Sequence, residues 1–399
     1  MNRGSRGTTR PCVLISDGQE RGVLAAVRSL SRAGYEVDIA ASQHPAAARW
    51  SRACGRHIAV TDPKDDPLRF AEAIARIAGA RKYEVLIPGG DAALTAISAH
   101  RELIEPVVRI GLPDAGAVDR ALDKATLTRI ATEVGFAVPP TAVCEHEDEA
   151  LAAADGFGYP VVFKSHRSVF EHGAGLRRRV GVVVPDEPAL AELLADYGRP
   201  WLIQQRVDGP VVSFAGVHAG GRLLASTVSR YRRTWPPEAG NVSSSVSIAP
   251  DPDLAGRVEA LIGRLGWQEI FELELVESPG GALPIDLNPR VYGSMTLAER
   301  ARTPLAPIWC DWLRGLEPRF GIGTAGCRYR WEEAELRNLA LMLRGLRLRE
   351  AAELTRPRLG TAHAFFERSD PLPLIAAGIV AVRRRLYGRR EPRSGLRRG

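Results

Sequence analysis

Lysine is scarce in this chain of 399 residues, because only Lys64, Lys82, Lys124 and Lys164 occur against 50 arginines. Either cation serves at most exposed positions, but a compact ammonium that contacts a phosphate in a tight site is not equivalent to a planar guanidinium. Where arginine fills nearly every cationic position, each remaining lysine is a candidate for a functional role.

Cysteine and long apolar segments are also rare. The five cysteines are odd in number and no two lie within three residues of each other, which fits neither a disulfide framework nor a zinc site and agrees with a reducing cytosol. No apolar stretch follows the basic N-terminus, so we expect no secretory signal. The longest apolar run, 372–382, is shorter than the roughly 20 residues that span a bilayer. The sequence therefore predicts a cytoplasmic protein without a transmembrane segment.

The net charge of +7 is confined to one end of the chain. Residues 383–399 contain eight arginines and one glutamate, so residues 1–382 are balanced. Tyr387 is the only ring in this tail, which lacks the aromatic residues of a nucleic-acid stacking surface, and we expect no nucleic-acid partner. A solvated tail is the preferred interpretation, and a weak contact with an anionic membrane, aided by 372–382, is the alternative.

The first third of the chain alternates strand and helix patterns. Apolar runs are separated by helical periodicities in the order 12–16, 20–32, 35–41, 57–60, 67–79, 85–88, 91–103 and 107–112. This order predicts an α/β fold with a parallel sheet wrapped by helices. The first turn, DGQERG, lacks a GxGxxG fingerprint, so a dinucleotide site is not expected.

A hairpin near residue 280 is the most informative element. Glu272 and Glu274 share one face of its first strand, and Asp286 and Asn288 share one face of the second. A Gly-Gly turn joins the strands, so carboxylates and an amide are expected to converge at one end. Such oxygen ligands suit Mg²⁺ together with nucleotide phosphates. The equal alternative is a strand pair with a polar, solvated face.

Four motifs in order resemble the ATP-grasp superfamily. Asp286-Leu-Asn-Pro-Arg290 is similar to the E-x-N-x-R stretch of that family, with aspartate in place of the first glutamate. The segments 121–124 (ALDK) and 159–164 (YPVVFK) look like those that carry its two phosphate-binding lysines. The segment 202–209 (LIQQRVDG) is similar to the hinge that holds adenine.

The resemblance covers about three quarters of the chain and implies a domain order. It implies a Rossmann-like pre-ATP-grasp domain at 1–115 and a two-subdomain α+β ATP-grasp fold, followed by a helical C-terminal extension. The small, lid subdomain would lie at 116–200 and the large subdomain with the Mg²⁺ site at 201–320. The helical extension and basic tail would then span 321–399.

The resemblance also implies site residues and cofactors. ATP and Mg²⁺ are the expected cofactors, with Mn²⁺ as a substitute. Arg290 would hold a carboxylate or an acyl phosphate, since its fork matches that geometry, and Lys164 would share in catalysis. The nucleotide-binding candidates are Lys124, Lys164, Gly173, Gly175, Gln204, Gln205 and Val207, and the metal ligands are Glu274, Asp286 and Asn288.

The sequence departs from the family at several positions. Val211 stands where a ribose-binding glutamate is often found, and the phosphate-covering loop, 166–179, carries arginines beside its glycines. The segment 230–241 either faces the substrate or forms a surface loop. Asp91, after a predicted strand, either contacts substrate or caps the next helix, and capping is the preferred interpretation.

The function implied by the resemblance is an ATP-dependent ligase. A carboxylate would be activated as an acyl phosphate with release of ADP, and then joined to an amine. Two alternatives remain at this point: a carboxylase-type enzyme that phosphorylates bicarbonate, and a nucleotide-binding regulatory protein without turnover. The expected partners are small-molecule acid and amine substrates, with a homodimer left open.

Overall fold

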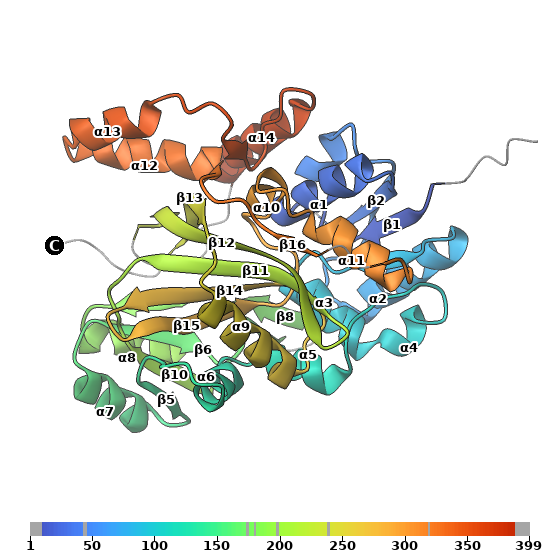
Figure 1. Ribbon diagram of the computed structural model, residues 1–399. Coiled ribbons are helices and arrows are strands. Elements are labelled where there is room, and N and C mark those ends of the chain that lie inside the picture. The colour runs from blue at the N-terminus through green and yellow to red at the C-terminus, as the bar shows by residue number, and fades with distance from the viewer. Residues whose placement is uncertain are drawn as a thin grey trace, which may run out of the picture.

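The computed structural model describes residues 10–42, 46–172, 175–178, 181–196, 199–237, 240–317 and 320–387. Most of the basic tail, 388–399, therefore lies outside the described residues. Figure 1 shows the N-terminal α/β layer at one side and a large twisted sheet at the centre, with a helical extension above them. The mixed α/β class expected from the sequence is confirmed.

The N-terminal part forms the expected parallel sheet. Its strand order is β3-β2-β1-β4, and every neighbouring pair is parallel. The strands and helices of this part are β1 (Cys12–Ile15), α1 (Arg21–Arg32), β2 (Glu36–Ala41), η1 (Ala47–Trp50), β3 (His57–Ala59), α2 (Pro67–Ala80), β4 (Val85–Ile87), α3 (Asp91–Ala99) and α4 (Arg101–Ile104). The strand expected at 107–112 is reduced to a single bridge between Val85 and Arg109.

The next part is an antiparallel sheet of order β5-β10-β6-β9. Helices α7 and α8 supply apolar side chains to the core on this sheet, which includes Phe163, Leu190 and Trp201. The elements from 115 to 205 are α5 (Ala115–Leu122), α6 (Lys124–Glu133), β5 (Thr141–Cys144), α7 (Glu147–Phe157), β6 (Val161–Ser165), β7 (Val169–His172), β8 (Gly175–Arg178), β9 (Val182–Val184), α8 (Glu187–Asp196) and β10 (Trp201–Gln205).

The segment 166–179, expected to be a loop, contains the antiparallel strands β7 and β8. This hairpin lies against the N-terminal part: the Leu176 amide donates to the Lys64 carbonyl at 2.6 Å, and Val169 and Leu176 pack on Ala92. A Cβ atom at Gly175 would collide with the Lys64 carbonyl, so the close approach requires glycine there. Tertiary packing therefore orders a segment that has no strand signal in its sequence.

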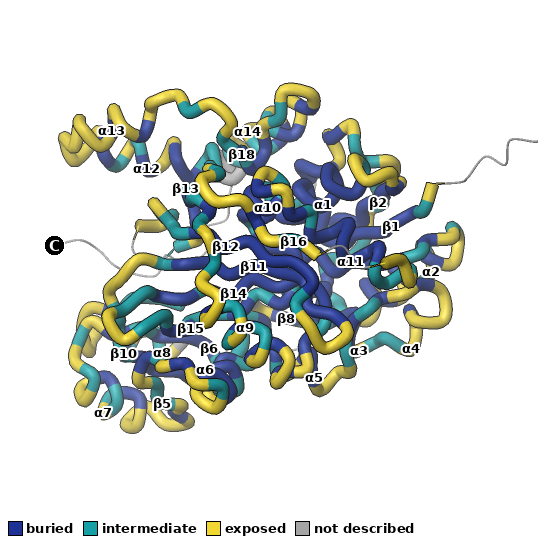
Figure 2. Tube along the Cα trace, in the orientation of Figure 1, coloured by how far each residue is buried: buried dark blue, intermediate teal, exposed yellow. Residues whose placement is uncertain are grey.

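The central sheet has the order β15-β14-β11-β12-β13-β17-β18, with β16 beside β12. Apolar side chains cover both of its faces, and Figure 2 shows the resulting buried centre. Its elements and the adjacent helices are β11 (Val211–Ala219), β12 (Arg222–Trp235), β13 (Asn241–Ile248), α9 (Pro252–Leu265), β14 (Glu269–Ser278), β15 (Gly281–Asn288), α10 (Thr296–Arg300), α11 (Leu305–Leu313), β16 (Gly321–Ile322), β17 (Arg328–Arg330) and β18 (Ala362–His363).

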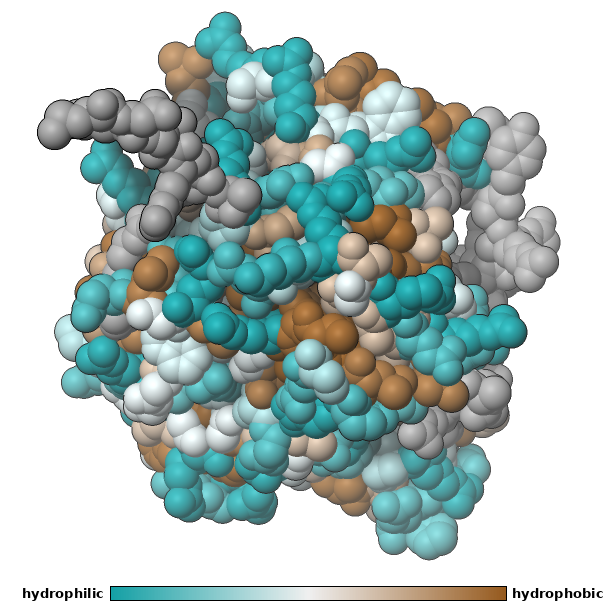
Figure 3. All heavy atoms as spheres, turned by 90° about the vertical axis from the view of Figure 1, so that its right-hand side faces the viewer, coloured by the Kyte–Doolittle hydropathy of each residue, from teal (hydrophilic) through white to brown (hydrophobic). Residues whose placement is uncertain are grey.

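The C-terminal extension is helical, as expected, and comprises α12 (Glu332–Arg344), α13 (Leu348–Thr355) and α14 (Leu372–Tyr387). Figure 1 shows α12 and α13 extending away from the body. Hydrophilic residues cover most of the face in Figure 3, with apolar residues in patches between them. Among the described residues, none of the helices has the length and apolar character needed to cross a membrane.

A buried ion pair joins the extension to the N-terminal part. Arg28 of α1 donates from Nε to Asp370 Oδ2 at 2.9 Å, and Ser51 Oγ donates to the same oxygen at 2.5 Å. Both charged side chains are buried, with 4% and 8% of their surface exposed. Although burial alone would raise it, the pKa of Asp370 is lowered by the hydrogen bond from Ser51 and by other contacts, including Arg28.

We expect Asp370→Ala to lower the free energy of unfolding by about 3 kcal/mol, because the buried Arg28 would lose the nearer of its two carboxylate partners and keep only Glu367, at 3.6 Å. Chemical denaturation measures the change. Glu350→Ala removes an exposed partner of Arg347 and serves as the control, with an expected change of less than about 0.5 kcal/mol. Equal effects of the two substitutions would contradict the structural role of Asp370.

Candidate active site

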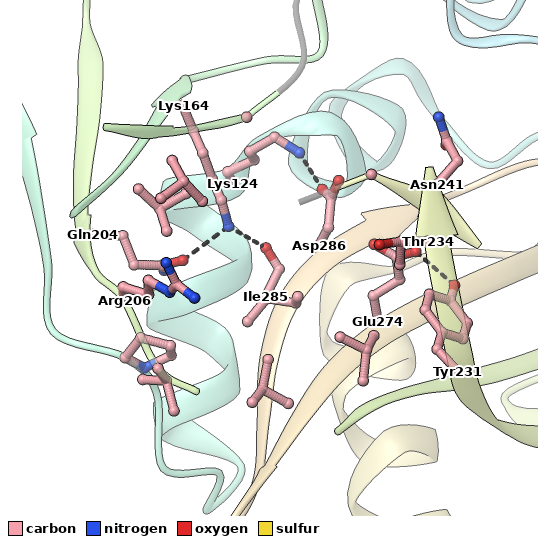
Figure 4. Close-up of a pocket in the computed structure, with 18 of the residues that line it drawn as sticks. Lys124, Lys164, Gln204, Arg206, Tyr231, Thr234, Asn241, Glu274, Ile285 and Asp286 are labelled. Atoms are coloured by element: carbon pink, nitrogen blue, oxygen red, sulfur yellow. Dashed lines mark hydrogen bonds and ion pairs between the residues drawn. The ribbon is translucent and has the colours of Figure 1, made fainter. Parts of the chain in front are cut away.

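A cavity of about 320 Å³ lies between the antiparallel sheet and the central sheet. Strands β6, β9 and β10 supply one wall, and β12, β14 and β15 supply the other. Figure 4 shows that lysine side chains enter from one side and carboxylates from the other. Two separately folded sheets therefore bring opposite charges together.

Both lysines singled out from the sequence lie in this cavity. Lys124 is the first residue of α6, whose N-cap Asp123 accepts from the Thr126 amide at 2.8 Å. The Lys124 ammonium is paired with Asp286. The helix start thus fixes where the Lys124 side chain begins.

Lys164 extends from β6 and is buried. Its Nζ donates to Gln204 Oε1 and to the Ile285 carbonyl, both at 2.8 Å, as Figure 4 shows. Burial lowers the pKa of Lys164 to about 8, since removal from water disfavours the charged form. The cavity therefore contains an ammonium held by neutral oxygens, and within the described part of the chain no carboxylate is among its hydrogen-bond partners.

The register of the β14–β15 hairpin pairs the polar residues that the sequence predicts to converge. Glu274 lies opposite Asp286, and Glu272 lies opposite Asn288. Burial, followed by the neighbouring carboxylates Glu272 and Asp286, raises the pKa of Glu274 to about 8. Tyr231 of β12 donates to Glu274 Oε1 at 2.7 Å. The hairpin end thus concentrates negative charge in a buried place.

This donor set fits a divalent cation. Glu274, Asp286 and Asn288 all line the cavity and present carboxylate or amide oxygens, which Mg²⁺ prefers. A bound cation would also relieve the repulsion that raises the pKa of Glu274. Within the described residues, no group of three or more His, Cys, Asp or Glu side chains is placed to hold a metal, and the third oxygen donor of this set is the amide of Asn288.

The hinge candidates Gln204, Gln205 and Val207 also line the cavity. Gln204 is held on both sides, because its Oε1 accepts from Lys164 and its Nε2 donates to Thr141 Oγ1 at 2.9 Å. Val211 presents an apolar surface to the cavity. Of the two glycine candidates, Gly173 lies outside the described residues, and Gly175 packs on Lys64 instead of lining this cavity.

Arg290 faces a second, smaller cavity of about 80 Å³. Its Nε and Nη2 donate to the two oxygens of Asp91 at 2.6 and 3.1 Å, and Nη2 also donates to Asn288 Oδ1 at 3.1 Å. Asp91 lines both cavities. The expected cap role of Asp91 is wrong, because Gly90 occupies the N-cap of α3 and the Asp91 carboxylate accepts the Arg290 fork.

The smaller cavity lies beyond the carboxyl ends of β1 and β4 and carries excess negative charge. Asp17, Glu20 and Asp91 line it, and Asp91 is compensated by Arg290. Lys64 lines it too, but its ammonium lies 3.7 Å from Asp62. Asp17 and Glu20 thus remain as the surplus charge of the lining.

Asp17 is the most unusual residue of this cavity. It is buried and has a φ of 54°, a left-handed conformation that few residues other than glycine, asparagine and aspartate adopt. Burial, together with Glu20 and Asp62, raises the pKa of Asp17 to about 7. The neighbouring Gln19 has a buried Oε1 atom without a hydrogen-bond partner among the described residues.

Several cavity residues were not among the sequence candidates. Tyr231, Thr234 and Asn241 come from β12 and β13, and Arg206 comes from the hinge. The segment 230–241, for which a surface loop was the alternative, therefore contributes to the cavity. Its strand signal was available in the sequence, but its pairing with β13 contains register shifts at Tyr231 and Arg233 that no local pattern indicates.

Comparison with known proteins finds relatives in sequence and neighbours in fold. No family model matches the chain. The chain is 27% identical over 310 residues to the formate-dependent phosphoribosylglycinamide formyltransferase of Solidesulfovibrio magneticus, covering 71% of each chain. It is similar to the biotin carboxylase domain of the Hydrogenobacter thermophilus 2-oxoglutarate carboxylase, a dimer in complex with MgADP, ADP and bicarbonate. The TM-score is 0.61 at 15% identity, covering 79% of this chain and 73% of that one.

The L-amino acid ligase of Bacillus licheniformis has a TM-score of 0.59 at 15% identity, covering 77% of this chain and 75% of that one. These relatives and neighbours are all ATP-grasp enzymes. The chain is therefore similar in sequence and in fold to enzymes of the ATP-grasp superfamily. The two lysines and the hairpin oxygens that the motif resemblance singled out line one cavity.

Proposed function

We propose that the chain is an ATP-dependent ligase that activates a carboxylate as an acyl phosphate, releases ADP and joins the acid to an amine. The observation that supports this most directly is the cavity itself. Lys124 and Lys164 face Glu274, Asp286 and Asn288 across it, which provides cations for a polyphosphate and oxygens for a divalent ion. Phosphoryl transfer needs mainly such positioning and charge stabilisation.

The nucleotide roles follow from this arrangement. Gln204, Gln205 and Val207 would hold adenine at the hinge, and the ammonium groups of Lys124 and Lys164 would neutralise the phosphates. Val211 offers no group that could bind a ribose hydroxyl, so Asp208, which lines the same cavity, is the nearest acidic candidate for that contact. Gly175 would act through the position of the β7–β8 hairpin, and Gly173 stays a candidate from the sequence alone.

Glu274, Asp286 and Asn288 would hold Mg²⁺, or Mn²⁺, which prefers similar oxygen ligands. The bound ion would supply positive charge beside the phosphates as ADP becomes the leaving group. Tyr231 would keep Glu274 in place through its hydrogen bond. Arg290 lies 3.1 Å from Asn288 Oδ1, so it would stabilise the developing acyl phosphate from the far side of this amide.

We assign the amine to the smaller cavity beside Asp91. Its surplus carboxylates, Asp17 and Glu20, attract a cationic amine. Gln19 Oε1, which has no hydrogen-bond partner among the described residues, can accept a hydrogen bond from that amine. Asp91 lines both cavities, so an amine held there would lie next to the acid activated in the larger cavity. The amine would give its extra proton to one of these carboxylates, and its nitrogen lone pair would then attack the acyl carbon. The bond from that carbon to the phosphate oxygen would break, and the leaving phosphate would take up the proton that the nitrogen loses on forming the amide.

The proposal keeps the four parts expected from the sequence, at 1–115, 116–200, 201–320 and 321–399. The first part would carry the amine cavity, and the next two would enclose ATP between them. The acid and the amine are small molecules in this assignment, and the basic tail has no part in the reaction.

The decisive test supplies ATP, Mg²⁺, pooled carboxylic acids and hydroxylamine, and measures ADP together with hydroxamates by mass spectrometry. We expect ADP and a hydroxamate in equal amounts, both lost in Asp286→Ala. AMP and pyrophosphate would exclude an acyl phosphate. Nucleotide binding without ADP release for any acid would instead favour the regulatory alternative.

A second prediction concerns the buried ammonium. Lys164→Ala should raise the Kd for MgADP at least about tenfold, because charge-assisted hydrogen bonds to phosphate are lost. Calorimetric titration measures the affinity. Lys82→Ala, which removes an exposed lysine, is the matched control and should bind as the wild type does. Unchanged affinity in Lys164→Ala would place the phosphates elsewhere.

A third prediction uses the raised pKa of Asp17. Asp17 ionises as the pH rises through about 7, so the KM for a cationic amine should fall over that range. Asparagine tolerates the left-handed backbone, so Asp17→Asn should fold and lose this pH dependence. The KM for ATP should stay unchanged. A pH profile that is the same in both proteins would remove Asp17 from the amine site.

A further inference from the structure

A third cavity, of about 810 Å³, lies apart from the two that serve the proposed reaction. It is formed by the end of α1, by the segment 296–302 and by the segment 358–369 between α13 and α14. It shares no lining residue with either of the other cavities. The reaction proposed above therefore gives it no role.

Its lining is rich in arginine. The cationic side chains are Arg32, Arg300, Arg302, Arg358 and Arg368, and the acidic ones are Glu299 and Glu367. Arg32 contacts both acids, since its guanidinium lies 2.5 Å from Glu367 and 3.5 Å from Glu299. Arg358 is paired with Glu353, which lies outside the lining. Even with that acid included, five arginines face three carboxylates, so the cavity keeps surplus positive charge.

The loop is shaped around one of these guanidinium groups. Arg300 donates from Nε to the Gly360 carbonyl at 2.8 Å. Gly360 has a φ of 74°, and a Cβ atom there would collide with Arg300 Nη2, so only glycine allows this approach. A backbone carbonyl therefore holds the Arg300 side chain in place, and no carboxylate is needed for this contact.

Two arginines keep their charge available. Arg302 and Arg368 are exposed, and within the described part of the chain they make neither an ion pair nor a side-chain hydrogen bond. An oxyanion that bridged them would gain charge-assisted hydrogen bonds that the protein alone does not provide. Arg302 and Arg368 come from different segments of the lining, so an anion with more than one phosphate group can pair with both, whereas a single carboxylate carries one negative charge.

Aromatic rings form another part of the lining. His363 and Phe366 contact each other edge to face, with ring centroids 5.7 Å apart, and Phe366 is 39% exposed. The His363 Nδ1 atom has no hydrogen-bond partner among the described residues. The lining therefore combines cations with a ring surface, and His363 Nδ1 faces Glu332 Oε1 at 3.7 Å.

From these features we propose that this cavity binds a soluble small molecule that carries at least two phosphate groups, at a site separate from the ATP cavity. Arg302 and Arg368 contact the phosphates, and Arg300 fixes the shape of the loop. His363 and Phe366 contact the remainder of the ligand. The assignment stands on the lining residues and is independent of the ligase activity.

Pyrophosphate serves as the probe, in calorimetric titrations of the full chain. Because pyrophosphate could also enter the ATP cavity, the titrations use both the wild type and Lys164→Ala. We expect R302A/R368A to raise the Kd of one class of sites at least about tenfold in either background. Arg349→Ala is the control. It removes an exposed arginine that lies on α13 and outside the cavity lining, so it should leave the Kd unchanged. Circular dichroism verifies that each variant is folded.

Identical isotherms for wild type and R302A/R368A would overturn the proposal. A lipid headgroup carries the same phosphate chemistry, so a second arm measures binding to vesicles that contain phosphatidylglycerol. Vesicle binding that depends on Arg302 and Arg368, without pyrophosphate binding, would show a membrane ligand and would also overturn the assignment of a soluble one. Because neither residue lies near the ATP cavity, loss of pyrophosphate binding with normal ADP release would separate this site from the proposed reaction.

Discussion

The structure of the candidate active site depends on opposite charges held across one poorly solvated cavity. Removing a carboxylate or an ammonium from water costs several kcal/mol, and a single partner recovers only part of that cost. This cost is visible in two pKa values: burial lowers the pKa of Lys164 to about 8 and raises that of Glu274 to about 8. A polyphosphate and a divalent cation would supply the missing counter-charges for both, so ligand binding and stabilisation of this cluster are one process.

Strand pairing and the start of one helix hold the charged side chains in their places around the cavity. The hairpin register places Glu274 opposite Asp286, while the capped start of α6 brings Lys124 to the same carboxylate. Strand β10 pairs with β6, so Gln204 can accept from Lys164. The two carboxylates therefore depend on the hairpin register, Lys124 on the start of α6 and Lys164 on the pairing of β6 with β10. A shift in any of these would leave a buried charge without its partner.

The sequence was sufficient where chemistry is local. Lys124 and Lys164 stood out by residue type, and the polar ends of the β14–β15 hairpin followed from strand alternation and a Gly-Gly turn. Tyr231 was missed, because its approach to Glu274 depends on how β12 is placed beside β11 and β14. The β7–β8 hairpin was missed because its order depends on packing against Lys64 and Ala92, which lie about 80 to 110 residues earlier in the chain.

Lysine and arginine have different positions in the site because a narrow, buried cavity favours different cation shapes at different places. An ammonium is compact and can approach a phosphate in a narrow cavity, and Lys124 and Lys164 are both there. Arg290 instead uses its planar fork to hold both oxygens of Asp91 between the two cavities, a bidentate contact that lysine could not make. Asp91 thereby holds Arg290 next to Asn288, so one ion pair links the smaller cavity to a proposed metal ligand in the larger one.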